Sequence, residues 1–215
     1  MSAARPEDFI RAWTAAAAPP LCPELRLRLA GPVTPLWEAT EKTLEREGLP
    51  PPYWAFAWPG GQALARYLLD HPREAAGRRV LDFAAGCGIA GIAAAKAGAR
   101  SVVASDLDAF ARAAIALNAA LNGVTVEASA DDFTAGGAGF DVILAGDVCY
   151  ERPMAERVWP WLKARAAAGA SVLLADPGRA YLPKEGLREL ARYAVPTTLE
   201  LEDRTVRETA VYAVG

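Results

Sequence analysis

Apolar runs of strand type alternate with stretches of helical periodicity from residue 79 onward. This alternation is typical of βαβ units arranged around a parallel sheet. The pattern predicts strands at residues 79–83, 101–105, 125–128, 140–145 and 170–175. It predicts helices at residues 89–97, 108–121 and 153–168, the second with Asp108 as its N-cap.

The C-terminal part has a different pattern. A further helix is predicted at 184–193, and two strand-type runs follow at 197–202 and 206–214 with only a few residues between them. Such a short connection favours an antiparallel hairpin, because a parallel return needs a crossover of about a dozen residues or more. The expected fold class is therefore α/β, with a Rossmann-like, mostly parallel sheet that ends in an antiparallel hairpin.

The first 60 residues form neither pattern consistently. A helix is predicted near 7–17 and an alternating strand at 25–29, and the segment 49–61 (LPPPYWAFAWPGG) mixes proline with aromatic residues. We expect residues 1–60 to be an N-terminal extension that caps the ligand-binding edge of the sheet, and residues 61–215 to be one compact domain. A group of acidic residues in the extension can attract a basic partner, although a solvated helix face is the simpler interpretation: Glu38, Glu41, Glu45 and Glu47.

Composition and charge narrow the function classes. The 215 residues carry a net charge of −3, so the chain has no global field that would attract phosphates, and nucleic acid is not an expected partner. The single histidine, His71, argues against a Ser-His-Asp triad and a multi-histidine metal centre. Three cysteines without CxxC spacing, no lipid-length apolar run and no secretory signal lead us to expect a cytoplasmic protein without membrane contact or a metal. We also expect a monomer.

The run 80–91 (VLDFAAGCGIAG) is the clearest chemical motif. It ends a predicted strand and continues as Gly86-x-Gly88-x-x-Gly91 into a helix, and these glycines permit a sharp turn with close approach of a ligand to the backbone. About 20 residues after Gly86, Asp106 ends the next predicted strand, where its carboxylate can accept hydrogen bonds from ribose hydroxyls. The motif indicates a nucleotide-type ligand, and by itself it fits both NAD and S-adenosylmethionine.

Three features favour S-adenosylmethionine. Asp82 precedes the glycines and can organise a cationic methionine group, whereas the pyrophosphate of NAD gains nothing from a carboxylate there. Asp131-Asp132-Phe133 follows the third predicted strand and can hold the adenine amino group. The terminal hairpin is the third feature, since an NAD-type sheet more often continues with parallel strands. Helix capping remains an alternative role for both Asp82 and Asp106.

With these motifs in place, the sequence resembles the seven-strand methyltransferases, and more narrowly the family 16 group of protein-lysine methyltransferases. The motifs that carry the resemblance are Trp58 in AFAWPGGQALARYLL, the Asp82 and glycine loop, Asp132-Phe133 where the family often has Asp-Trp, and the D-x-x-Y motif from Asp147 to Tyr150. Within that group, PPPYWAFAWPGGQALARYLLD is most similar to enzymes that methylate lysines of the electron transfer flavoprotein beta subunit, including bacterial relatives. The sequence departs from the pattern at Ala84, where many methyltransferases have glycine, and at Phe133.

The resemblance implies a protein-lysine N-methyltransferase that uses S-adenosyl-L-methionine, with the electron transfer flavoprotein beta subunit as the expected protein substrate. Spacing and resemblance together assign two catalytic residues, Asp147 and Tyr150. They assign the cofactor to Trp58, Asp82, Gly86, Gly88, Asp106 and Asp132.

The expected chemistry is alignment of a neutral amine with the methyl group and exclusion of water. A lysine ammonium, with a pKa near 10.4, has no lone pair, so an apolar pocket must lower that pKa and Asp147 can then orient the amine. Methylation of another protein or of a small amine remains an alternative, as does a binding module without turnover. The loop 176–179 has either a substrate contact or only a turn function.

Overall fold

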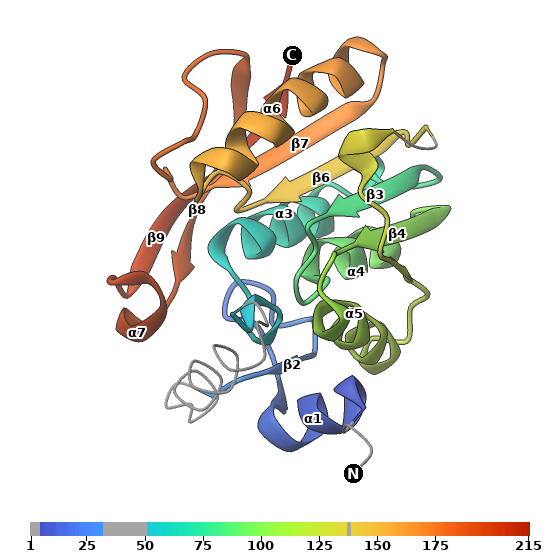
Figure 1. Ribbon diagram of the computed structural model, residues 1–215, viewed down its shortest axis with the longest axis vertical. Helices are drawn as coiled ribbons and strands as arrows, with labels where there is room; N and C mark the ends of the chain where they lie inside the picture. Colours follow the sequence, from blue (N-terminus) through green and yellow to red (C-terminus); the bar gives the residue numbers. More distant parts are fainter. Residues whose placement is uncertain (1–4, 32–50, 137–138) are drawn as a thin grey trace.

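The computed structural model describes residues 5–31, 51–136 and 139–215. Its main sheet has seven strands in the order β5-β4-β3-β6-β7-β9-β8 (Figure 1). The first five strands of that order pair in parallel, and β9 pairs antiparallel with both β7 and β8. The α/β, Rossmann-like fold with a terminal antiparallel hairpin is thereby confirmed. The strands are β3 (Arg79–Phe83), β4 (Ser101–Ser105), β5 (Glu127–Ser129), β6 (Val142–Gly146), β7 (Ser171–Asp176), β8 (Leu187–Pro196) and β9 (Val206–Val214).

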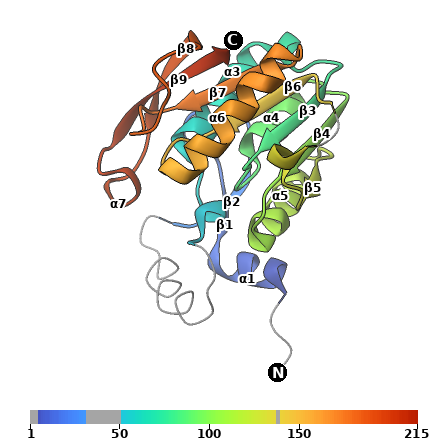
Figure 2. The ribbon, with the colours of Figure 1, turned by 45° about the horizontal axis from the view of Figure 1, so that its top comes forward.

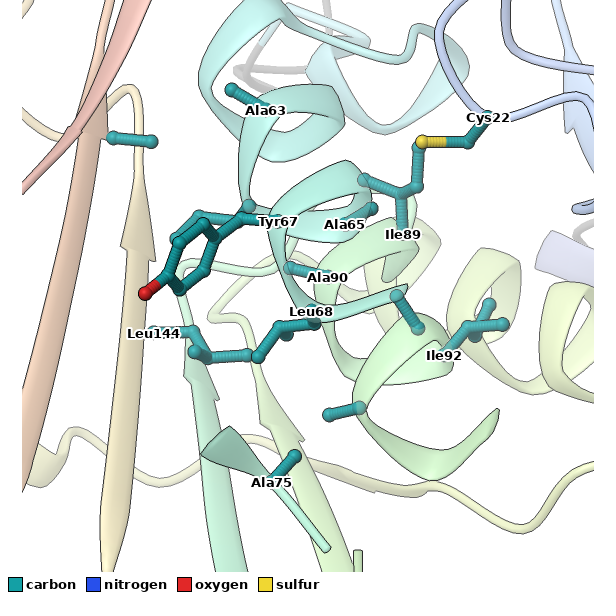
Figure 3. Close-up of a cluster of buried hydrophobic side chains, with 14 of the residues drawn as sticks. Cys22, Ala63, Ala65, Tyr67, Leu68, Ala75, Ile89, Ala90, Ile92 and Leu144 are labelled. Carbon is teal, nitrogen blue, oxygen red and sulfur yellow. The ribbon is translucent and has the colours of Figure 1, made fainter. Parts of the chain in front are cut away.

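Helices cover both faces of the sheet because successive side chains of a strand point to opposite sides. Val80 of β3 and Leu144 of β6 pack against α3 and α4, whereas their neighbours Leu81 and Ile143 pack on the side of α6. Figure 3 shows side chains of α3, α4 and β6 that meet in the buried core on the α3 and α4 side of the sheet. The helices are α3 (Pro59–Asp70), α4 (Ile89–Lys96), α5 (Ala109–Leu121) and α6 (Arg152–Ala167).

Most predicted elements lie within one or two residues of the observed ones. The predicted strands at 79–83 and 101–105 match β3 and β4 residue for residue, and Asp108 caps α5 by accepting a hydrogen bond from the Phe110 backbone N–H at 2.8 Å. The strand predicted at 125–128 is observed two residues later, as β5. Local periodicity is thus a sufficient guide where the chain alternates strictly between strand and helix.

The predicted helix at 184–193 is wrong, because this segment belongs to the edge strand β8. Leu187, Leu190 and Ala191 have helical spacing, so the local pattern is compatible with a helix. Pairing with β9 decides the outcome: Ala191, Tyr193 and Val195, spaced two residues apart, all belong to the α3-side core, and a register shift lies between Glu189 and Ala191. The terminal hairpin therefore consists of β8 and β9.

The strand predicted at 197–202 is also wrong, because it forms the short helix α7 (Leu199–Glu202) between β8 and β9. The chain has to turn back within this segment for β9 to pair with β8, so a single helical turn replaces the expected strand. Figure 2 shows α7 at the end of the β8–β9 hairpin.

The N-terminal segment packs against α5. It contains α1 (Pro6–Trp13), a two-stranded antiparallel sheet of β1 (Ala15–Ala17) and β2 (Leu27–Leu29), and the 3-10 turn η1 (Tyr53–Ala55). Ile10, Trp54 and Ala114 share a buried cluster that joins α1, η1 and α5. The helix predicted at 7–17 is shorter than expected, since its last residues form β1. The acidic residues from Glu38 to Glu47 lie outside the described residues.

In the described parts of the chain, no helix is both long enough and apolar enough to cross a membrane.

Candidate functional site

A cavity of about 460 Å³ opens at the carboxyl edge of the parallel strands. Its wall is formed by the loops after β3, β4, β5, β6 and β7 together with residues from the aromatic segment 51–58. Ligands of open α/β sheets bind at this edge. The cavity is lined by all but one of the site residues predicted from sequence, namely Trp58, Asp82, Gly86, Asp106, Asp132, Asp147 and Tyr150.

Gly88 is the predicted residue that does not line the cavity. It is the N-cap of α4 with φ +77°, and a Cβ added there would lie 3.0 Å from Ile115 Cγ1 of α5. It therefore serves the turn and the packing of α5 against the loop. Ala84 has φ +52°, so the loop keeps its left-handed turn without the usual glycine, at a conformational cost of about 1–2 kcal/mol.

Asp82 is the most deeply buried carboxylate of the cavity wall, with 3% exposure. Its Oδ2 accepts a hydrogen bond from the Gly91 backbone N–H at 2.7 Å, so it also caps the first turn of α4. Burial raises the pKa of Asp82 to about 7, against the lowering effect of that hydrogen bond. The geometry is compatible with both roles expected for Asp82, cofactor binding and helix capping, because its side chain lines the cavity and also caps α4.

Asp106 links the two loops that follow β3 and β4. Its Oδ2 accepts from the Gly86 backbone N–H at 2.9 Å, and its Oδ1 accepts from the Asp108 backbone N–H at 3.0 Å. Burial raises the pKa of Asp106 above its usual range. Each carboxylate oxygen has two lone pairs, so these bonds leave capacity for the hydroxyls of a ligand.

Asp132 has a more polar environment. Its Oδ1 accepts from the Thr134 hydroxyl at 2.6 Å and from the Thr134 backbone N–H at 3.1 Å, and its Oδ2 pairs with Arg157 Nη1 at 2.9 Å. The hydrogen bond from the Thr134 hydroxyl is the main cause that lowers the pKa of Asp132. This residue is therefore an anion at neutral pH.

Asp147 lies directly after β6 with φ +55°, a conformation that aspartate tolerates better than most residues. Its Oδ2 accepts from the Gly60 backbone N–H at 2.6 Å, in the first turn of α3, where the helix dipole favours an anion. Its Oδ1 accepts from Arg179 Nη2 at 3.1 Å. Burial raises the pKa of Asp147 to about 6, while the charge of Arg179 opposes that shift.

Arg179 connects the cavity with the hairpin of β8 and β9. Its Nη1 donates to Glu202 Oε2 at 3.0 Å, and its Nη2 bonds both Glu202 Oε1 and Asp147 Oδ1. Arg207 Nε donates to the same Glu202 Oε2 at 2.9 Å. Four charged side chains from the end of β6, the loop after β7, α7 and β9 thus form one continuous network.

An aromatic wall lies beside Asp147. The Tyr53 ring contacts the rings of both Trp58 and Tyr150, with centroids 5.8 Å apart in each pair, and Trp58 Nε1 donates to the Tyr53 carbonyl at 2.8 Å. Phe56 adds a ring contact to Trp58 at 5.9 Å. Burial raises the pKa of the Tyr150 hydroxyl to about 12, so it remains neutral at any physiological pH. The wall offers an apolar path to the carboxylate of Asp147.

Gly60 and Glu202 had no role in the sequence-based prediction, and the role of Arg179 was left open. Gly60 is in direct contact with Asp147, and the Pro59-Gly60-Gly61 sequence at the start of α3 is the available signal. Arg179 belongs to the loop 176–179, for which the sequence left both a substrate contact and a turn function open. Glu202 carries no recognisable signal, because it lies in a run predicted to be a strand.

The chemistry of the cavity fits a cationic nucleoside rather than a dinucleotide. Carboxylates from three successive strand ends line it, namely Asp82, Asp106 and Asp132, and among the described residues no basic side chain is hydrogen bonded to Asp82. A sulfonium and an ammonium gain from such an environment, whereas a pyrophosphate would be repelled. The residues present therefore fit S-adenosylmethionine.

Comparison with known proteins agrees with this chemistry. The family model described as ribosomal protein L11 methyltransferase (PrmA) matches residues 63–177. The chain is 40% identical over 199 residues to the electron transfer flavoprotein beta subunit lysine methyltransferase of Danio rerio, covering 89% of this chain and 76% of that protein. It is 37% identical over 219 residues to the protein of the same name from Xenopus laevis, covering 99% of this chain and 88% of that one.

Among solved structures, the chain is similar to magnesium protoporphyrin IX methyltransferase (ChlM) from Synechocystis PCC 6803 with bound SAM. The TM-score is 0.55 at 17% identity, and the match covers 86% of each chain. At that identity the likeness supports the fold alone.

Proposed function

The chain belongs to the electron transfer flavoprotein beta subunit lysine methyltransferase family and is an S-adenosylmethionine-dependent methyltransferase. From that premise we propose that it methylates lysine of the electron transfer flavoprotein beta subunit. The observation that carries this proposal is the position of Asp147. Its largely buried carboxylate lines the cavity next to the aromatic wall of Tyr53 and Tyr150, as a site for an amine requires.

The residues proposed to hold the cofactor lie over β3, β4 and β5. Asp106 would accept from the ribose hydroxyls, Asp132 from the adenine amino group, and Asp82 would face the cationic methionine portion, with Gly86 allowing close approach of the backbone. Trp58 would cover the ligand from the side of the extension. When bound, the cofactor supplies an electrophilic methyl group on sulfur.

The residues proposed to handle the acceptor lie over β6 and β7. A lysine side chain that enters along Tyr53 and Tyr150 loses water, and this desolvation lowers the pKa of its ammonium. The proton leaves to solvent before transfer, and the Asp147 carboxylate accepts a hydrogen bond from the neutral amine, which fixes the direction of the nitrogen lone pair. No covalent bond to the enzyme is formed.

We also propose that residues 1–60 cap the cofactor edge of a single compact unit formed with residues 61–215, and that the enzyme acts as a cytoplasmic monomer without nucleic acid. The packing of α1 on α5 and the cavity contacts of Tyr53 and Trp58 support the cap. Size-exclusion chromatography with light scattering, with and without the flavoprotein, tests the oligomeric state.

The activity is tested by incubating the purified protein with labelled S-adenosylmethionine and a purified electron transfer flavoprotein, followed by mass spectrometry of peptides. We expect methyl groups on lysine of the beta subunit. Ribosomal protein L11, offered in parallel, tests the acceptor of the broader family. Asp147→Asn should lower kcat by about 100-fold or more, because the anionic acceptor for the amine is lost, while calorimetric affinity for S-adenosylhomocysteine stays near the wild-type value. Methylation of L11 but not of the flavoprotein would reject the proposed substrate.

A further inference from the structure

We propose that Glu202 is a positioning residue for methyl transfer: it holds the Arg179 guanidinium, which in turn fixes the Asp147 carboxylate at the acceptor end of the cavity. The proposal rests on the proposed function, because it assigns that end to a lysine amine. Glu202 itself lies in α7, which connects β8 to β9 at the turn of the hairpin (Figure 2). It does not line the cavity.

The burial of Glu202 is the first argument. Its side chain is 2% exposed, and its carboxylate accepts from Arg179 at both oxygens and from Arg207 at one. A buried ion pair is seldom a gain in stability over apolar residues of similar volume, because both charges lose their hydration. A bidentate pair in such a place is better explained by the geometry that it imposes on Arg179.

The sharing of Arg179 is the second argument. One of its nitrogens, Nη2, bonds Glu202 Oε1 and also lies 3.1 Å from Asp147 Oδ1. The guanidinium is planar and rigid, so fixing two of its nitrogens on Glu202 fixes the direction of the bond to Asp147. Without that support, the long Arg179 side chain could reorient around the carboxylate.

The balance of charge is the third argument. The charged groups around Arg179 are Asp147 after β6, Asp176 at the end of β7 and Glu202 in α7, and Arg207 in β9 pairs with the same Glu202. An unbalanced guanidinium at the cavity would repel an incoming lysine ammonium. Glu202 offsets that charge, so the carboxylate of Asp147 remains attractive to the lysine.

The neighbouring residue Asp203 provides a matched control. Its side chain is 77% exposed and pairs only with Arg207, at 2.9 Å, among the interactions of the described residues. Its φ of +54° suits asparagine as well as aspartate, so Asp203→Asn removes one negative charge next to Glu202 without backbone strain.

The test compares Glu202→Gln and Asp203→Asn with wild type in steady-state methylation of the flavoprotein, across pH. For Glu202→Gln we expect kcat/KM to fall by roughly 10- to 100-fold, because Asp147 is misplaced, with affinity for S-adenosylhomocysteine unchanged. Loss of one negative charge also lowers the pKa of the bound lysine ammonium, so the acidic limb of the kcat profile should move to lower pH. Asp203→Asn should match wild type in all three measurements.

If Glu202 has a purely structural role, Glu202→Gln should lower the Tm and leave the acidic limb of the kcat profile at the wild-type pH. Either this result or a kcat/KM within twofold of wild type would overturn the proposal. The double variant Arg179→Gln with Glu202→Gln keeps the test decisive if the single variant unfolds, because it removes both members of the pair. It should be as active as Arg179→Gln alone, since Glu202 acts through Arg179, and a further loss would contradict this. Failure of wild type to methylate any protein lysine would instead reject the function.

Discussion

The contact between Gly60 and Asp147 gives the sharpest prediction. An alanine Cβ at position 60 would lie 2.6 Å from both Asp147 Oδ2 and the Ala175 carbonyl oxygen, and 2.7 Å from the Asp147 backbone nitrogen. Ordinary contacts begin near 3.4 Å, so α3 and the end of β6 must separate by about 0.8 Å. Two of the three blocking atoms are backbone atoms, which cannot rotate away. Gly60→Ala should therefore cost about 1–3 kcal/mol of stability.

The same displacement should affect catalysis more than folding. A shift of about 1 Å in a positioning group can cost about 100-fold in rate, so we expect kcat to fall by roughly 30- to 100-fold while the affinity for S-adenosylhomocysteine remains unchanged. Methylation kinetics, calorimetry and thermal unfolding measure the three quantities. Gly215→Ala is the control, because a Cβ there would meet no atom of the described residues within 4 Å. A Gly60→Ala enzyme with kcat within twofold of wild type would refute the assigned role of the Asp147 position.

Three further predictions concern the cavity wall. Ala84→Gly should raise stability by about 1 kcal/mol, seen as a Tm increase of ~2–4 °C, because φ +52° no longer strains the chain; an unchanged or lower Tm would contradict this. Asp82 has a pKa of about 7 in the folded protein against 3.8 ordinarily, so its contribution to the stability of the fold decreases as the pH rises from 3.8 to 7. Affinity for the cationic cofactor should instead increase near pH 7, because Asp82 becomes negatively charged there. Calorimetry at several pH values should show that rise for wild type and not for Asp82→Asn. Tyr150→Phe should retain kcat/KM within about threefold, since the ring contact with Tyr53 persists, while Tyr150→Ala should lose ~10-fold; equal losses would indicate a role for the hydroxyl.

The sequence predicts the half of the fold in which local pattern and tertiary pairing agree. β3 and β4 are central strands whose residues are almost continuously buried, as in a parallel sheet covered on both faces, and the glycine loop between β3 and α4 has conformations that only a few residue types allow. β8 is different, since it is an edge strand whose charged outward residues Arg188, Glu189 and Arg192 follow no strict alternation. Its state depends on β9, which lies later in the chain, so a local window could not reveal it.

The same distinction applies to the site. Asp82, Gly86 and Asp106 belong to one β3-α4-β4 unit, and in such a unit the parallel pairing of the two strands brings Asp106 next to the glycine loop. Arg179 and Glu202 meet only because the hairpin returns α7 to the end of β7, so no sequence interval predicts their bond. A long-range ion pair of this kind becomes visible only with the tertiary structure.

The order of strands divides the cavity between two tasks. The proposed cofactor half is formed by β3, β4 and β5, which carry the glycine loop and the carboxylates of Asp82, Asp106 and Asp132. The proposed acceptor half is formed by β6 and β7, with α7 and β9 supporting Arg179 through Glu202 and Arg207. Because the antiparallel hairpin borders only the acceptor half, changes in β8, α7 and β9 can alter the acceptor without disturbing cofactor binding. Substitutions in the hairpin can therefore change specificity for a protein lysine while the proposed methyl-donor site stays the same.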